Sequence, residues 1–256
     1  MNFFSLIHVE FKKIRRSKIL LLLLAAVIIL WVPSILNASV NFNIQDIGIS
    51  PENNFLIQGF LGMSWFLFPA SMVACTVLLN QTERGNNGIL KMLALPVNTA
   101  KLCIAKFTVL LSLAAAQILM SVGMYFISAA IASQTQHYPF LLSPTFVLKE
   151  AGLIFLASVP MITFFQALSV CIRTPVFSVG IGLASIVPSV LMINTKAWFA
   201  WPMSYPLFII TSEYGKLASS MDASRIEWIP WIPVAAIFTV VCFLLSCFCF
   251  GRAERK

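Results

Sequence analysis

Residues 19–36 read ILLLLLAAVIILWVPSIL, an apolar run that contains no charged residue. A helix needs about 20 apolar residues to cross about 30 Å of hydrocarbon, so this run predicts a membrane-spanning helix. Five further runs have the same character, at residues 59–79, 107–131, 151–172, 176–193 and 229–250. None of them shows the alternating pattern of the strands of a membrane β-barrel. The expected fold is therefore an all-α integral membrane protein with six transmembrane helices in a single domain, residues 1–256.

The composition of the whole chain supports this fold class. Of the 256 residues, 59% are hydrophobic and only 10% are charged, whereas soluble domains contain about 25% charged residues. The first apolar run follows a basic segment, so a cleaved secretory signal is the alternative interpretation of the N-terminus. The run is longer than the apolar core of such a signal, about 7–15 residues, which favours a first span that is retained.

Basic residues indicate the side of the membrane that each connection faces. If the N-terminus is cytoplasmic, 13 of the 17 Lys and Arg residues fall in inner segments, and the opposite orientation reverses this ratio. Because Lys and Arg accumulate in cytoplasmic loops, we expect both termini to be cytoplasmic. Orientation and contact with anionic lipid then explain the net charge of +8. The basic residues are divided among separate inner segments, which argues against binding of nucleic acid.

Residues 1–18 predict an amphipathic helix that lies in the membrane interface. Successive residues turn by about 100° around a helix, which places apolar side chains on one face and most basic ones on the other. Glu10 falls among the apolar residues, and Lys13, three residues later, is its expected ion-pair partner. The alternative for Glu10 is contact with a partner protein. The residues assigned to the interface helix are Phe3, Ile7, Glu10, Phe11 and Ile14.

The segment between the fifth and sixth spans, about 194–228, predicts a broken helical hairpin. The sequence KAWFAWPMSYPLFIITSEYG (196–215) is apolar and aromatic, but Pro202 and Pro206 prevent one continuous helix. We expect this hairpin to dip into the outer leaflet. Irregular backbone at that depth is tolerated only where protein buries it.

The middles of the six predicted spans contain no Asp, Glu, Lys or Arg. Ion-driven transporters often place ionisable residues there, so their absence weighs against an ion-coupled mechanism. Gln117 and Gln166 are polar residues inside predicted spans. Each is interpreted either as the donor of an interhelical hydrogen bond or as part of a substrate path.

The sequence carries no recognisable catalytic motif. It lacks H-E-x-x-H, G-x-S-x-G and the G-x-x-x-x-G-K-[ST] loop that holds nucleotide phosphates. The six cysteines lie within or beside predicted spans, which argues against a disulfide framework. Cys247 and Cys249 are better explained by apolar packing than by metal binding, so no metal site is expected. We expect no enzymatic activity in this chain.

A polar stretch, LNQTERGNNGILKMLALP (79–96), interrupts the apolar sequence on the predicted cytoplasmic side. Its first half contains flexible and turn-forming residues. Its second half is apolar, ends at Pro96 and suits a short helix parallel to the membrane. An ordinary solvated loop is the alternative interpretation.

At this stretch the sequence resembles the permease subunits of type-2 (ABC-2) ABC exporters. The resemblance extends over the whole chain, from the basic N-terminal helix to the broken hairpin before the last span. Its local features are an acidic residue after span two, a glycine-containing turn, a leucine and a proline, and spaced lysines. These residues are Glu83, Gly85, Gly88, Leu93, Pro96, Lys101 and Lys106.

The resemblance implies roles for several residues and partners. The N-terminal helix and the stretch around Glu83 would contact a separate P-loop ATPase, with Arg173 in a second, smaller contact. The coupling residues of that stretch would be Glu83, Arg84, Gly85, Gly88, Leu93 and Pro96. ATP and Mg²⁺ would bind to a dimer of the ATPase, so no cofactor is expected in this chain. A second permease chain, identical or related, would complete the pathway across a bacterial cytoplasmic membrane.

The short chain and the sequence MLALPVNTAKL (92–102) most resemble the small permeases of lantibiotic and bacteriocin immunity systems. That resemblance implies removal of antimicrobial peptides from the membrane. The alternatives are export of another drug or lipid-like substrate, ion-coupled secondary transport, and a structural or signalling role without transport.

Overall fold

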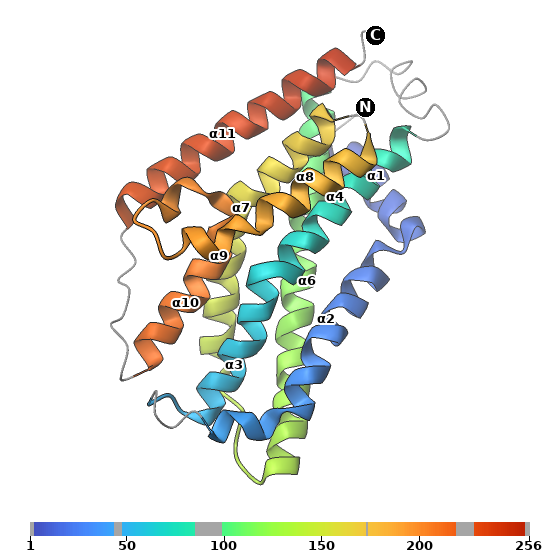
Figure 1. The fold of residues 1–256 in the computed structure, drawn as a ribbon. Coiled ribbons are helices and arrows are strands. Elements are labelled where there is room, and N and C mark those ends of the chain that lie inside the picture. The colour runs from blue at the N-terminus through green and yellow to red at the C-terminus, as the bar shows by residue number, and fades with distance from the viewer. Residues whose placement is uncertain (1–2, 44–47, 85–98, 173, 219–227, 254–256) are drawn as a thin grey trace.

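The computed structural model describes residues 3–43, 48–84, 99–172, 174–218 and 228–253, which form a bundle of helices without strands (Figure 1). Six helical segments are long and apolar enough to cross a membrane. Their bounds are Ile19–Leu36, Pro51–Asn80, Ala100–Gln136, Pro144–Cys171, Pro175–Met192 and Ile229–Phe250. The predicted all-α fold with six membrane-crossing helices is confirmed.

The first span is separated from the N-terminal helix by one residue. α1 (Phe3–Ser17) ends before Lys18, whose φ of 55° lies in the left-handed region, and α2 (Ile19–Leu36) follows. Few residues other than glycine adopt that conformation, so Lys18 marks a true break between the two helices. The bounds of α2 are those predicted from its apolar run.

The second span begins at Pro51 instead of residue 59. It consists of α3 (Pro51–Gly62), a π-helical turn η3 (Met63–Leu67) and α4 (Phe68–Arg84). The apolar run 59–79 missed this start because the first turns of α3 carry polar residues. Asn54 in these turns is buried, and its Nδ2 donates to Asn41 Oδ1 over 2.7 Å beside the short helix η1 (Ala38–Phe42). This hydrogen bond satisfies the buried Asn54 amide, a polar group that is not part of the apolar run.

The third and fourth spans also extend beyond their apolar runs. α6 (Thr99–Gln136) and α7 (Pro144–Cys171) leave only residues 137–143 between them. The Tyr125 hydroxyl holds this connection, because it donates to the Phe140 carbonyl and accepts from the Leu142 amide, both over 3.1 Å. The connection therefore lies against α6, and the predicted loop 132–150 is shorter than expected.

The fifth span is divided at a proline into α8 (Pro175–Ile186) and α9 (Pro188–Met192). Two short helices follow, η5 (Trp198–Ala200) and η6 (Pro202–Ser204), and then α10 (Tyr205–Leu217). Pro202 and Pro206 each stand in the first turn of a helix, where the missing amide costs nothing. The predicted interruption of this segment is confirmed. The last helix is α11 (Trp228–Ala253).

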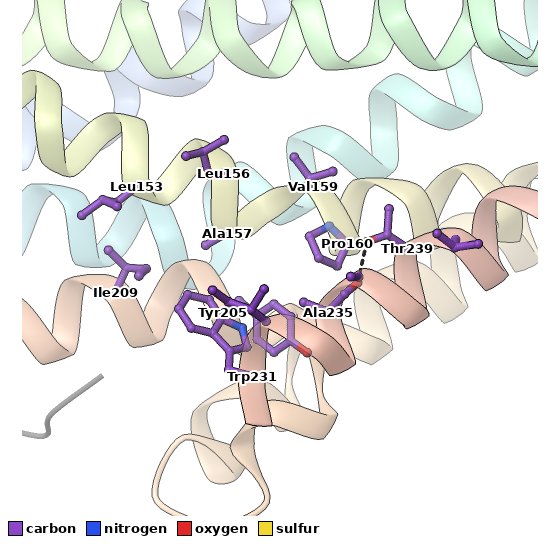
Figure 2. A pocket seen from close by; sticks show the side chains of 13 residues that line it. Leu153, Leu156, Ala157, Val159, Pro160, Tyr205, Ile209, Trp231, Ala235 and Thr239 are labelled. Carbon is purple, nitrogen blue, oxygen red and sulfur yellow. Dashed lines mark hydrogen bonds between the residues drawn. The ribbon is translucent and has the colours of Figure 1, made fainter. Parts of the chain in front are cut away.

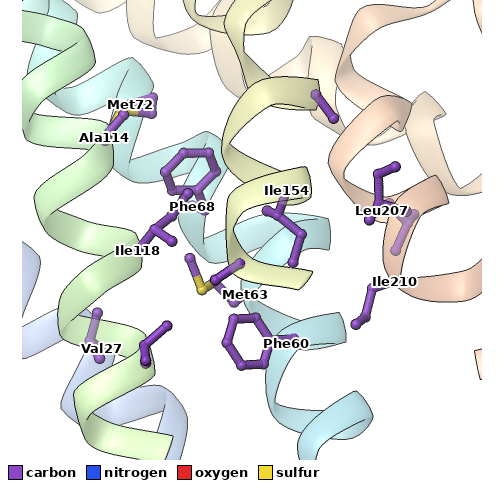
Figure 3. Packing of buried hydrophobic residues seen from close by; sticks show 14 of the residues in the cluster. Val27, Phe60, Met63, Phe68, Met72, Ala114, Ile118, Ile154, Leu207 and Ile210 are labelled. Atoms are coloured by element: carbon purple, nitrogen blue, oxygen red, sulfur yellow. The ribbon is translucent and has the colours of Figure 1, made fainter. Parts of the chain in front are cut away.

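The core lies between α3, α4, α6, α7 and α10 (Figure 3). Two of its residues, Leu207 and Ile210, come from α10, which contacts both α7 and α3. α10 is thus part of the bundle core instead of a surface appendage. It runs from the α9 side of the bundle towards the end opposite α1 (Figure 1). Other members of the core are Phe60, Met63, Phe68, Met72, Ala114, Ile118 and Ile154.

Candidate functional site

Helices from both ends of the chain meet in a small apolar cluster at one end of the bundle (Figure 1). We call it the α1 cluster; its buried members are Leu6, Leu102, Ala105, Val170 and Phe250. They come from α1, α6, α7 and α11, and Phe3 and Ile7 of α1 pack against them. α1 packs mainly on α6, and the cluster connects this contact to the ends of α7 and α11.

The residues assigned to the interface helix divide between two surfaces. Glu10 and Ile14 are buried, whereas Phe11 is exposed. Phe4, which shares the apolar face in the sequence pattern, is 82% exposed. The buried Glu10 carboxylate pairs with Lys13 Nζ over 2.6 Å, which confirms the predicted ion pair. α1 thus has one side against the bundle and another that is available to lipid or to a partner.

Most of the predicted coupling residues lie outside the described residues. These are Gly85, Gly88, Leu93, Pro96 and Arg173. Glu83 and Arg84 form the last turn of α4. That turn lies at the same end of the bundle as α1 (Figure 1). The elements expected to contact an ATPase are thus on one side of the molecule as far as they are described.

A buried lysine at this end was not recognised as a site from the sequence. Lys106 of α6 is only 4% exposed, and its Nζ lies 3.5 Å from Asn80 Oδ1 and 5.3 Å from the centre of the Phe250 ring. Asn80 in turn donates to Ser169 Oγ of α7. A cation over an aromatic ring is stabilised by the ring's negative face. Lys106 therefore connects α4, α6 and α11 beside the α1 cluster.

Gln117 and Gln166 both make interhelical hydrogen bonds. Gln117 Nε2 donates to Ser71 Oγ of α4 over 3.0 Å, and Gln166 Nε2 donates to the Cys103 carbonyl of α6 over 3.4 Å. Both side chains are buried, and neither lines the two cavities described below. This geometry favours the structural interpretation of the two residues. A place in a substrate path stays untested for both.

A groove of about 580 Å³ lies between α7, α10 and α11 (Figure 2). Its wall is almost entirely apolar, and Tyr205 and Trp231 close one end of it. Its residues occupy positions 153–160 of α7 and 231–240 of α11, and both of these helices are candidate membrane spans. The lining residues are Leu153, Leu156, Ala157, Val159, Pro160, Tyr205, Ile209, Trp231, Ile232, Ala235, Ala236, Thr239 and Val240.

The aromatic end of the groove is built by the broken hairpin. Trp198 of η5 stacks on Phe208 of α10 with ring centres 3.6 Å apart, and both rings contact Trp231. Trp198 and Tyr205 both contact the ring of Trp231 near the start of α11, so packed aromatic rings form this part of the groove wall.

A second cavity, of about 410 Å³, has four side-chain amides among its eight lining residues. It lies between α2, η1 and α3, and its polar residues are Ser34, Asn37, Asn41, Asn54 and Gln58. Amides donate and accept hydrogen bonds without carrying charge. The cavity suits neutral polar groups, and the sequence did not predict it because its residues come from two predicted segments that the fold brings together.

Buried carboxylates at the end opposite α1 are paired within their own helices, and one hydrogen bond ties the 137–143 connection to α3. The buried carboxylates of Glu150 and Glu213 pair with Lys149 and Lys216 over 3.2 Å and 2.9 Å. Tyr138 donates to Glu52 Oε2 over 2.5 Å, and this carboxylate raises the pKa of the Tyr138 phenol. These pairs explain why polar residues are tolerated at the ends of the spans.

Within the described ranges, no group of three or more His, Cys, Asp or Glu side chains is placed to hold a metal ion. Six apolar helices around a packed core define a multi-pass membrane protein, with an apolar groove and an amphipathic helix attached at one end.

Residues 6–189 match the ABC-2 family transporter proteins, and the chain belongs to this family. The match begins within α1 and ends within the fifth span, so it includes the α1 cluster residues from α1, α6 and α7. No curated protein and no solved structure matches the chain. ABC-2 permeases are the membrane components of transporters and generally work with a separate ATPase subunit.

Proposed function

We propose that this chain is the transmembrane permease subunit of an ATP-driven exporter in a bacterial cytoplasmic membrane. The observation that carries the proposal is the family match over residues 6–189, in a chain that has six spans. Its sequence contains no loop for binding a nucleotide phosphate, so the energy would arrive from a separate P-loop ATPase. A dimer of that ATPase would bind ATP and Mg²⁺, and two permease chains would form the pathway.

The coupling surface in this proposal consists of α1, the end of α4 and the residues that follow it. α1 supports the assignment because it packs on α6 and shares the α1 cluster with the ends of α7 and α11. A push on α1 by an ATPase would therefore act first on α6 and, through the α1 cluster, on the ends of α7 and α11. Lys106 and Asn80 extend the same connection to α4.

The test of coupling is the charge reversal Glu83→Lys, with Glu83→Asp as the matched control. Glu83→Lys replaces an anion by a cation at the proposed contact, whereas Glu83→Asp keeps the sign of the charge. We expect normal membrane insertion of both variants, and loss of ATPase copurification and ATP-dependent export only for Glu83→Lys. Loss of a rim charge pair typically costs affinity of about tenfold or less, so the copurification is measured at limiting ATPase concentration. Full export by Glu83→Lys would contradict this coupling site.

The proposed substrate is an antimicrobial peptide of the lantibiotic or bacteriocin class. Such peptides are amphipathic, and the apolar groove with its aromatic end supports binding of the apolar side of an amphiphile from the membrane. The same groove supports a lipid-like substrate as the second candidate. Deletion of the protein should raise sensitivity to membrane-active peptides if the first candidate is correct.

The role of the groove is tested by filling it. Ala236 lines the groove, whereas its neighbour Ile237 does not line it and is 65% exposed. Ala236→Trp should weaken stimulation of the ATPase by substrate, and Ile237→Trp is the control on the same helix. Burial of one large apolar group is worth about 1.5–3 kcal/mol, so the loss in apparent affinity should be about tenfold or more. Equal effects of the two variants would mean that the substrate binds elsewhere.

A further inference from the structure

Four of the six cysteines gather where α11 meets α6 and α7, beside the α1 cluster. Cys171, the last residue of α7, has its Sγ 2.7 Å from Cys249 Sγ of α11. Two residues earlier on α11, Cys247 is the hydrogen-bond partner of Cys103 on α6. All four are free thiols in this structure. α11 therefore brings one cysteine against each of its two neighbours.

The sulfur atoms of Cys171 and Cys249 lie close enough for a disulfide to form between them. A disulfide bond is about 2.05 Å long, so the two sulfurs at 2.7 Å need to approach by only about 0.7 Å. α7 and α11 are packed against each other, so the two cysteines stand on helices that are already neighbours. The sequence predicted only apolar packing for Cys249, because the partner lies 78 residues away in the chain.

We propose that Cys171 and Cys249 are a modification site that a low-molecular-weight disulfide such as glutathione disulfide converts into an intramolecular disulfide. The Cys171 thiolate attacks one sulfur of the small disulfide, forms a mixed disulfide and releases the first small thiol. Cys249, as its thiolate, then attacks Cys171 Sγ, which forms the Cys171–Cys249 bond and releases the second small thiol. Two protein thiols and one small disulfide thus give one protein disulfide and two small thiols.

The exposure of the four cysteine side chains decides which sulfur reacts first. It also distinguishes the pair Cys171 and Cys249 from the pair Cys103 and Cys247. Cys171 is exposed and Cys249 is half-buried, so the small disulfide reaches Cys171 first. The second step is intramolecular between adjacent sulfurs, which makes it fast compared with a further encounter in solution. In the other pair Cys103 is only 1% exposed and Cys247 is half-buried, so neither of its sulfurs is as open to the reagent as that of Cys171.

The bond has a mechanical consequence at the α1 cluster. Cys249 packs against this cluster, and Val170 and Phe250, the neighbours of the two cysteines in sequence, are among its members. A covalent bond fixes the end of α7 to α11 at the point where α1 is held. Thiols are kept reduced in the cytoplasm, where disulfides are mostly transient or redox-sensing, so on the predicted orientation the bond forms only under oxidation. Under the proposed function, on which this step alone rests, oxidation slows export.

The test uses the full-length protein, purified without any ATPase. The protein is treated with glutathione disulfide, its free thiols are blocked with N-ethylmaleimide, and its peptides are identified by mass spectrometry. We expect a cross-linked peptide pair joining Cys171 to Cys249 that disappears after reduction with dithiothreitol. It should be absent from Cys171→Ser and Cys249→Ser, and retained in the double variant Cys103→Ser/Cys247→Ser. These near-isosteric changes keep the fold, which circular dichroism verifies.

Two outcomes overturn the proposal. One is a stable mixed disulfide on Cys171 with Cys249 still alkylated, which shows that the second sulfur does not reach the first. The other is oxidation of Cys103 and Cys247 in preference to the proposed pair. Export by the complete transporter is then compared before and after oxidation, in the wild-type chain and in Cys171→Ser. A cross-link that forms without changing export leaves the modification site intact and removes its consequence under the proposed function.

Discussion

Gly59 of α3 lies directly against the indole ring of Trp31 in α2. A Cβ atom at Gly59 would stand 2.3 Å from Trp31 Cη2, far inside van der Waals contact. The ring has little freedom to move, because Trp31 is fully buried and its Nε1 donates to Ser121 Oγ over 3.0 Å. The close approach of α2 and α3 therefore requires glycine at this position.

Gly59→Ala should destabilise the protein, and Gly152→Ala is its control. The added methyl group at Gly59 forces the Trp31 ring out of place, and overpacking of this kind costs about 1–3 kcal/mol. A Cβ at Gly152 meets nothing within 4 Å, so alanine there should be neutral or should stabilise α7 by up to about 1 kcal/mol. Thermal unfolding in detergent measures both. A Gly59→Ala protein as stable as wild type would mean that the ring is free to shift.

Individual residues were predictable from the sequence when their partners are close in the chain. Glu10 and Lys13 are three residues apart, and their ion pair was predicted and is confirmed. The sequence marked Lys106 only as one of two spaced lysines, and the structure buries it over the Phe250 ring. That contact joins α6 to the end of α11, and no local pattern encodes it.

At the scale of elements, α1 is held to the bundle by one stripe of side chains. Leu6 is 4% exposed within the α1 cluster, whereas Phe4, two residues earlier, is 82% exposed. The sequence pattern placed both on one apolar face, because periodicity does not distinguish a surface that faces protein from one that faces lipid. Which apolar residues hold α1 to its neighbours is a tertiary property.

Leu6→Ala should loosen α1, and Phe4→Ala should not. Removal of a buried leucine side chain costs about 2 kcal/mol at the lower end of the known range, because the cavity that it leaves collapses only partly. If α1 opens locally, its amide hydrogen exchange should accelerate by roughly thirtyfold. Exchange measured by mass spectrometry in detergent checks this. Similar acceleration in both variants would show that the α1 cluster does not anchor the helix.

The observed helices agree with the predicted apolar runs only where a helix is apolar up to its ends. The run predicted α2 without error, because that helix is apolar up to both of its ends. The runs predicted starts for α3 and α7 that were too late, since both helices begin at a Ser-Pro pair followed by polar residues. Helix ends are set by capping and proline, whereas hydropathy records only the part that meets hydrocarbon.

At the scale of the whole molecule, burial divides the spans into two groups. In their most apolar stretches, 56–67% of residues are buried in Pro51–Asn80, Ala100–Gln136 and Pro144–Cys171. Only 22% are buried in Ile19–Leu36 and Pro175–Met192, and 11% in Ile229–Phe250. Three spans thus form a central core and three lie at its edge.

The orientation of the bundle in the membrane is predicted from the distribution of Lys and Arg alone. α1 and the end of α11 lie at one end of the molecule (Figure 1), and that end holds most of the 17 basic residues under the predicted topology.

We therefore expect a fluorescent protein fused after Lys256 to fluoresce in the cytoplasm. Alkaline phosphatase, which is active only outside, should be active when fused after Gln136 and inactive when fused after Cys171. Replacement of Lys12, Lys13, Arg15 and Arg16 by glutamine should weaken this orientation, since basic residues near the first span set it. Phosphatase activity after Cys171 and none after Gln136 would reverse the orientation and, with it, move the proposed ATPase contacts to the outer face.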